Sequence, residues 1–124
     1  MQTKEQKRAE FALAQIQAKF SGQVDSDTAN FLVGMPTMVL TNGIGQSMAF
    51  LLSKKPKRQH VNTFDILKTW LSQEIPELAT NAQNNNMQFL INFATIDQQM
   101  YLTAQNEALA MLNWLKRYAR AFEV

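Results

Sequence analysis

Residues 97–122, DQQMYLTAQNEALAMLNWLKRYARAF, carry the longest helical pattern in the chain. Their apolar side chains recur at intervals of three and four residues, which is the spacing of one stripe along an α-helix. Asp97 precedes the stripe and suits an N-cap, because its carboxylate can accept hydrogen bonds from free N–H groups of the first turn. We therefore predict a long final helix with the inward stripe Met100, Ala104, Ala108, Met111, Leu112, Leu115, Ala119 and Phe122.

The same periodicity extends upstream through five shorter segments, and no segment shows the alternation of a strand. The pattern therefore predicts an all-α fold, a compact bundle of about six helices, in a single domain over residues 1–124. The first helix has the inward stripe Ala9, Ala12, Leu13, Ile16 and Phe20. The expected helices before the last run from Thr3 to Phe20, from a cap at Ser26 or Asp27 to Leu40, from Gly45 to Ser53, from a cap at Asn62 or Thr63 to Gln73, and from Met87 to Ala94.

Two residues of the central region should have backbone roles. Pro36 removes a helix donor and crowds the preceding turn, so we expect a kink near Gly34. Gly43 follows Asn42 and should end the second helix, because only glycine freely adopts positive φ. The third helix is apolar nearly all round, with Phe50 among its members, and should be buried.

The composition excludes several classes of protein. With 124 residues and 46% apolar residues, the chain can form a core without covalent support. It has no cysteine, which excludes disulfides, thiolate metal sites and cysteine nucleophiles. It lacks both an apolar run of about 18 residues and the apolar core of a signal peptide, so we expect no membrane association and a cytoplasmic location.

The sequence gives no indication of an enzyme. His60 is the only histidine, and it has no neighbours that would make a catalytic triad or a histidine metal site. It lies beside a basic segment, and we interpret it as a surface or cap residue. No phosphate-binding glycine motif is present. We therefore expect no catalytic residues, no metal and no cofactor.

The electrostatic signal is local, because the net charge is only +2. Clusters of lysine and arginine in a sequence are either solvated helix ends or binding sites for phosphate, and sequence alone leaves both interpretations open. The basic residues concentrate in three clusters, namely Lys4, Lys7 and Arg8, then Lys54, Lys55, Lys57 and Arg58, and finally Lys116, Arg117 and Arg120.

The aromatic residues mostly follow the inward stripes and are expected in the core. Trp114 and Tyr118 lie one turn apart beside Arg117, so they are the best candidates for an exposed contact. Of the two, we expect Trp114 to pack and to anchor the last helix. The order helix, Asn42-Gly43, helix superficially suggests helix-turn-helix, but the third helix offers few polar side chains for reading bases. Sequence-specific DNA binding and a helical adaptor that binds only proteins both stay open as alternatives.

Residues 35–50, MPTMVLTNGIGQSMAF, resemble the central signature of the small-subunit family of the CRISPR type III-B (Cmr) effector complex. That signature is a proline in an apolar helix, a short turn ending in glycine and an aliphatic residue, then glutamine, small residues and Ala-Phe. Residues 107–119, EALAMLNWLKRYA, resemble the family's C-terminal motif, and Arg8-Ala9 in its alanine-rich helix also fits. Many members carry a basic residue just before the turn, where this chain has Leu40 and Thr41.

The resemblance implies a small helical protein with no activity of its own. Copies would stack as a minor filament beside guide RNA and target RNA, and would bridge the backbone and large subunits of the complex in antiviral defence. The basic clusters would then bind phosphate without reading sequence, since base-specific contacts need polar groups that this chain barely offers. Of the remaining residues, Pro36, Gly43, Phe50 and Trp114 are expected to have structural roles.

Overall fold

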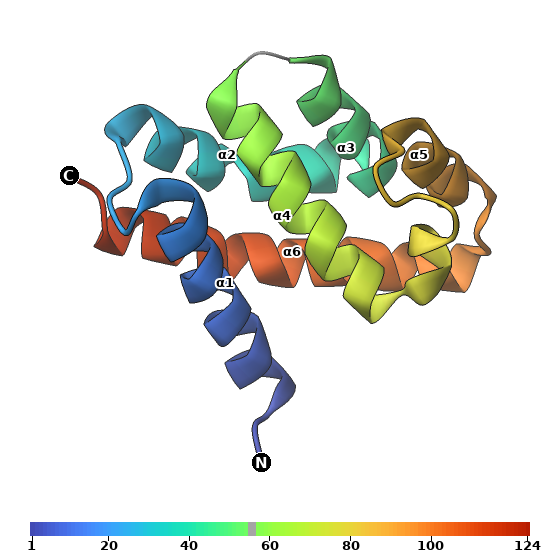
Figure 1. Cartoon of the computed structure of the whole chain (residues 1–124), viewed down its shortest axis with the longest axis horizontal. Coiled ribbons are helices and arrows are strands. Elements are labelled where there is room, and N and C mark those ends of the chain that lie inside the picture. Colours follow the sequence, from blue (N-terminus) through green and yellow to red (C-terminus); the bar gives the residue numbers. More distant parts are fainter. Residues whose placement is uncertain (55–56) are drawn as a thin grey trace. The chain divides into compact units, whose positions relative to one another are not determined.

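The computed structural model of the chain describes residues 1–54 and 57–124 (Figure 1). The helical elements within these ranges, joined by short connections, confirm the predicted all-α fold, and the β pairing within them is an isolated bridge between Val24 and Glu123. The elements are α1 (Lys4–Phe20), α2 (Ser26–Asn42), α3 (Ile44–Ser53), α4 (Arg58–Glu74), the 3₁₀-helix η1 (Pro76–Ala79), α5 (Asn86–Thr95) and α6 (Gln98–Ala121).

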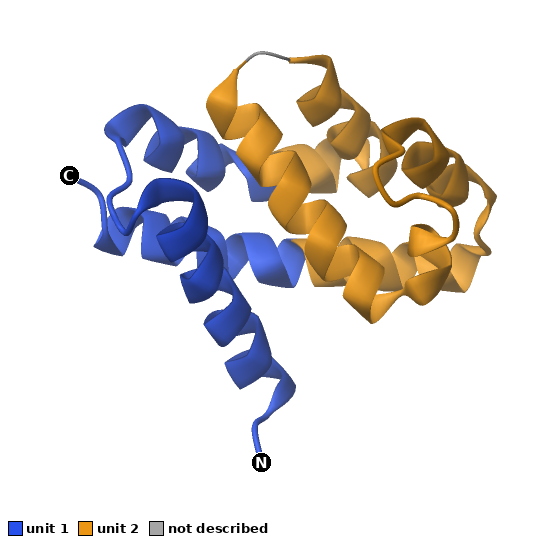
Figure 2. Cartoon of the chain, in the orientation of Figure 1, with its two compact units in different colours: residues 1–37, 109–124 blue, residues 38–108 orange. Residues whose placement is uncertain are grey.

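The chain divides into two compact units, which are described separately (Figure 2). Unit 1 comprises residues 1–37 and 109–124, and unit 2 comprises residues 38–108. A single domain over residues 1–124 therefore stays a prediction.

In unit 1, α1 begins where the sequence predicts. Thr3 forms a capping box with Gln6: the Gln6 N–H donates to Thr3 Oγ1 at 3.1 Å, and the Thr3 N–H donates to Gln6 Oε1 at 2.7 Å. Ala12 and Ile16 are buried as expected. Leu13 and Phe122 were expected to face inward, but each is 41% exposed, so both predictions are wrong. Phe122 lies past the end of α6, where the helical stripe no longer sets the direction of its side chain.

The start of α2 differs from the prediction by one residue. The cap is Asp25 rather than Ser26 or Asp27, because the Thr28 N–H donates to Asp25 Oδ1 at 2.7 Å. Pro36 lies inside α2, which continues to Asn42. Leu40, near the end of α2, is 66% exposed, because it lies off the stripe of Met35 and Val39, which are buried.

In unit 2, α4 begins earlier than predicted. It starts at Arg58, so the proposed cap at Asn62 or Thr63 is wrong. The Thr63 hydroxyl donates back to the Gln59 carbonyl at 2.7 Å, which is a contact made within a helix and not at its start. Lys57 takes the N-cap position without a side-chain hydrogen bond.

Aromatic rings pack edge to face through the core of unit 2, as their helical spacing predicts. The ring centroids lie 6.1 Å apart between Phe64 and Phe89, 5.2 Å between Phe89 and Phe93, and 6.2 Å between Phe93 and Tyr101. Such tilted arrangements match the positive ring edge with the negative ring face. The rings come from α4, α5 and α6 and therefore join these three helices.

A buried amide fastens α5 to the segment before it. Asn92 Nδ2 donates to the carbonyl oxygens of Leu78 and Thr80, each at 2.9 Å. Gln88 Nε2 donates to the Asn92 side-chain oxygen, also at 2.9 Å. One side chain thus donates to two backbone carbonyl oxygens of the segment before α5.

The turn into α3 is held by α6. Gly43 has φ +83°, which confirms the predicted positive φ. The Ile44 N–H donates to Gln105 Oε1 at 2.9 Å, and the Gly45 N–H donates to the Tyr101 hydroxyl at 3.0 Å. These side chains satisfy free N–H groups at the start of α3, which Gly43 cannot do because it has no side chain.

The expectation that α3 is buried all round is only partly correct. Ile44, Met48 and Leu51 are buried, whereas Ala49 is exposed and Phe50 is half-buried. A helix packed on one side exposes its other side whatever its composition, and alanine is small enough to be exposed at little cost.

Candidate nucleic-acid interface

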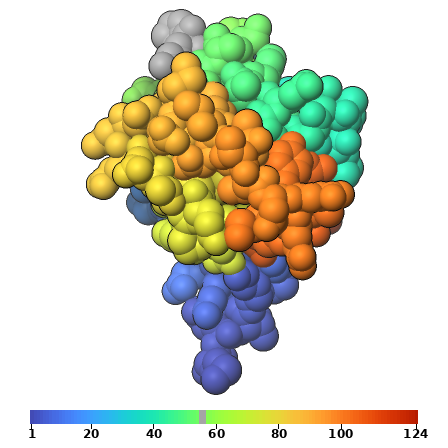
Figure 3. Space-filling view, turned by 90° about the vertical axis from the view of Figure 1, so that its right-hand side faces the viewer, coloured from blue at the N-terminus to red at the C-terminus, as the bar shows by residue number. Residues whose placement is uncertain are grey.

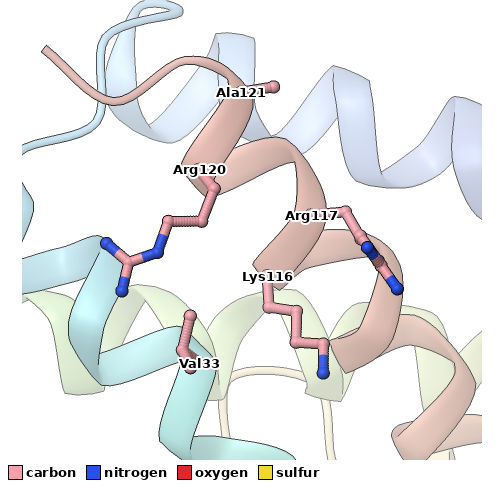
Figure 4. Close-up of a pocket in the computed structure, with 5 residues that line it drawn as sticks. All are labelled: Val33, Lys116, Arg117, Arg120 and Ala121. Atoms are coloured by element: carbon pink, nitrogen blue, oxygen red, sulfur yellow. The ribbon is translucent and has the colours of Figure 1, made fainter.

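The C-terminal basic cluster lines an open pocket in unit 1. Lys116 is half-buried in the last turns of α6, and Arg117 and Arg120 are exposed. Together with Val33 and Ala121, they line a pocket of about 500 Å³. Figure 4 shows Arg120 reaching from α6 toward the helix that carries Val33, whereas Arg117 reaches the other way. Positive charge gathered at a concave surface suits an anion such as phosphate.

The three cations of this cluster are not equivalent. Arg120 donates through one guanidinium nitrogen to Asn30 Oδ1 at 2.8 Å and through the other to Glu123 Oε1 at 2.9 Å. These two partners fix its side chain and partly neutralise its charge. Arg120 therefore forms a wall of the pocket, while Arg117 and Lys116 are the better candidates for phosphate.

The N-terminal basic cluster lies on the first turns of α1, also in unit 1. Lys4 and Lys7 are exposed, and Arg8 is half-buried and forms an ion pair with Glu5. The second oxygen of Glu5 accepts the Trp114 indole N–H at 3.1 Å. Glu5 therefore links the two clusters that are farthest apart in the sequence, and the charge pattern gave no signal for this role.

A second pocket of about 370 Å³ lies beside this link. Its walls are Glu5, Ala110, Asn113, Trp114 and Arg117. Arg117 lines both this pocket and the larger one. The Trp114 ring stacks on Tyr118 with 5.6 Å between centroids and 30° between planes. Trp114 thus stacks on a residue of its own helix and also borders a surface pocket, while its role as an anchor of the last helix stays a prediction.

The middle basic cluster belongs to unit 2 and surrounds the start of α4. Lys54, Lys57 and Arg58 are exposed, and Lys55 lies outside the described residues. The Lys57 N–H donates to the Lys54 carbonyl at 2.8 Å, so these two residues share one turn. The first turn of α4 contains no acidic residue. The helix dipole adds positive potential there, since the N-terminal N–H groups point outward.

His60 is buried, so its interpretation as a surface or cap residue is wrong. Its ring packs against Phe50 with 5.6 Å between centroids, which gives Phe50 a packing role. Burial lowers the pKa of His60 below the ordinary value of 6.5, and the positive charges of Lys57 and Lys54 lower this pKa further. The imidazole therefore favours its neutral form beside a basic surface.

Within the described ranges, no group of three or more histidine, cysteine, aspartate or glutamate residues is arranged to hold a metal ion. None of the helices described is both long and apolar enough to span a membrane.

Fold and surface together define a small helical protein whose basic side chains gather at helix ends. The family model described as CRISPR-associated protein (Cas_Cmr5) matches residues 4–122. The chain therefore belongs to the Cas_Cmr5 family, the small subunits of the CRISPR Cmr complex, which confirms the resemblance found in its motifs. Membership implies association with other Cmr subunits, and members are in general non-catalytic.

Proposed function

We propose that this subunit is non-catalytic and lies against RNA inside the type III-B effector complex. Copies of it stack as a minor filament beside guide RNA and target RNA and bridge the backbone and large subunits. Its lysines and arginines bind phosphates without reading sequence. The complex acts in the cytoplasm in antiviral defence.

The observation that carries this proposal is the joining of two basic clusters in unit 1. Glu5 pairs with Arg8 of the first cluster and accepts from Trp114, which is followed by the second cluster. Arg117 then lines two pockets beside that link. A positive surface built from both ends of the sequence suits a long polyanion better than a single small anion.

The middle cluster supports the same proposal from unit 2. Lys57 and Arg58 stand at the N-terminus of α4, where acidic residues normally accumulate because they interact favourably with the dipole. Two cations at this position raise the local positive potential, at a cost to helix stability. A phosphate bound there would interact favourably with both the dipole and the side chains.

The proposed contacts with other subunits use a different, apolar surface of unit 2. Leu40 and Met87 are 66% and 69% exposed, and Ile91 and Leu102 are also exposed. These residues come from the end of α2, from α5 and from the start of α6, and Figure 3 shows these segments on one face of unit 2. Exposed leucine and methionine side chains of this kind favour adaptable protein contacts.

Salt dependence of RNA binding tests the proposal. Because each neutralised phosphate contributes about 0.7 to the slope of log affinity against log salt on a single strand, Arg117→Gln should reduce that slope by about 0.7. Lys19→Gln is the matched control, because it removes the same charge from α1 outside the three clusters and should leave the slope unchanged. Equal slopes for Arg117→Gln and the parent chain would contradict the assignment of this residue.

The same measurements separate the alternatives. A protein-only adaptor would retain no RNA even at low salt, yet would still co-purify with the other Cmr subunits. A sequence-specific DNA-binding protein would prefer one duplex over others. The exposed side of α3 includes Gln46, Ala49 and Ser53, which is a poor set for reading base edges.

A further inference from the structure

We infer that the two pockets that share Arg117 form a binding site for one nucleotide of a single strand, with the base in the smaller pocket and the phosphate in the larger. This inference rests on the proposed function and makes it more specific. It replaces general phosphate binding by recognition of an unpaired, splayed-out nucleotide.

The smaller pocket has the chemistry that a base requires. Trp114 supplies an aromatic surface, and stacking on such a surface tolerates every base because each base has a π-face. Asn113 is exposed and supplies both a donor and an acceptor, which matches the mixed polar edge of a base. The volume of about 370 Å³ lies within the usual range for a ligand pocket.

The indole is held in place before any ligand arrives. Its N–H donates to Glu5 Oε2 at 3.1 Å, and its ring stacks on Tyr118. Glu5 is in turn fixed by its ion pair with Arg8. A base that enters the pocket therefore meets an ordered wall, and little side-chain freedom is lost on binding.

The larger pocket supplies the cations for the adjoining phosphate. Arg117 lines both pockets, so it belongs to the wall that the base and phosphate sites share. Lys116 adds a second cation, and Arg120 is already held by Asn30 and Glu123. Within one nucleotide a single sugar separates base from phosphate, which suits two pockets with a common wall. A duplex keeps its bases stacked and paired, so it cannot fill the smaller pocket.

The test compares binding of the full-length chain to a single-stranded RNA oligonucleotide and to a duplex of the same length. Trp114→Ala should weaken single-strand binding by about tenfold to a hundredfold, since it removes a stacking platform. Duplex binding should change less than about twofold by the same argument. The salt slope should stay unchanged, because no phosphate contact is removed. Asn113→Ala, at an exposed position, should weaken single-strand binding with the helical circular dichroism spectrum unchanged.

Two controls keep the outcome interpretable. Trp114→Phe retains an aromatic face and should bind single strands better than Trp114→Ala. Gln73→Ala changes an exposed residue of α4 that lines neither pocket, and it should leave RNA binding unchanged.

Three results would overturn the inference. Equal weakening of single-strand and duplex binding by Trp114→Ala would show that the pocket does not accept a base. Unchanged RNA binding in Trp114→Ala, with loss of co-purifying Cmr subunits, would make the pocket a protein contact. If the parent chain bound neither RNA at low salt, the proposed function itself would fail, and the parent measurement alone would reveal this.

Discussion

The indole N–H of Trp70 donates to Oε1 of Glu107 at 3.0 Å, which joins the C-terminal part of α4 to α6 inside unit 2. Both residues are buried, with exposed fractions of 4% and 8%. A buried carboxylate requires hydrogen-bond donors, because a buried carboxylate without them loses its hydration and gains no replacement partner, which destabilises the fold.

Removal of this donor should destabilise the chain. Trp70→Phe leaves one Glu107 oxygen short of its indole partner and creates a small void, so we expect a loss of about 1–3 kcal/mol in the free energy of unfolding. Trp114→Phe is the matched control, since it also removes an indole bond to a glutamate but at an exposed site. Urea denaturation followed by circular dichroism should show a much smaller shift for the control. Equal shifts would mean that burial of the Trp70 bond has no importance.

A glycine pair tests the turn into α3. Gly43 has φ +83°, and an added Cβ would lie 3.1 Å from the Tyr101 hydroxyl oxygen, so Gly43→Ala should cost about 1–2 kcal/mol. Gly34 lies inside α2 with nothing within 4 Å of an added Cβ, so Gly34→Ala should stabilise by about 0.5–1 kcal/mol. Thermal denaturation should therefore shift in opposite directions for the two variants. The same sign for both would refute the backbone argument.

His60 should make stability depend on pH. Its pKa in the folded chain lies below 6.5, chiefly because of burial and then because of Lys57 and Lys54. As pH falls below 6.5, the unfolded chain binds a proton that the folded chain does not, so stability decreases until the folded pKa is reached. His60→Gln should flatten this part of the curve when unfolding free energies are compared between about pH 7 and pH 5.

The lowered pKa of Asp25, caused by its hydrogen bonds to Thr28, acts in a separate window. Its contribution is present above the ordinary value of 3.8 and is lost as pH falls below it. A pH profile of His60→Gln that still fell steeply above pH 5 would therefore point to a group other than these two.

Position 92 should not tolerate a negatively charged side chain in place of the buried Asn92 amide. Asn92→Asp replaces the nitrogen that donates to the Leu78 and Thr80 carbonyls by an oxygen that repels them, and we expect a loss of at least about 2 kcal/mol. Asn106→Asp makes the same chemical change at an exposed position of α6 and should be nearly neutral. Hydrogen exchange of the amides in α5 should accelerate only in the first variant. Unchanged exchange would mean that α5 is held by its aromatic residues alone.

Helical periodicity predicted the class of fold and the buried stripe of α6 from Ala104 to Ala119, because these depend on spacing along one element. It failed where a residue leaves that spacing. Phe122 follows the last helical turn, and the start of α4 needed no side-chain cap. The burial of His60 depends on Phe50 from another helix, which no local pattern can show.

The candidate interface, like the fold, could be predicted from the sequence only in part. The basic clusters are visible in the sequence, since charge is a property of each residue. Their link through Glu5 joins positions 109 residues apart, so it follows only from the folded chain. The difference between Arg120 and Arg117 likewise depends on Asn30, a partner from α2.

The hydrogen bond from the Gly43 nitrogen to the Val39 carbonyl, 2.8 Å long, also bears on how the protein ages. An Asn-Gly pair normally deamidates fast, because the glycine nitrogen attacks the asparagine side chain to form a succinimide. Here that nitrogen is occupied at the end of α2, and Asn42 is held in helical geometry that keeps the attack from closing a ring. Isoaspartate at position 42, followed by peptide mapping during storage, should accumulate slowly in folded protein and rapidly after denaturation.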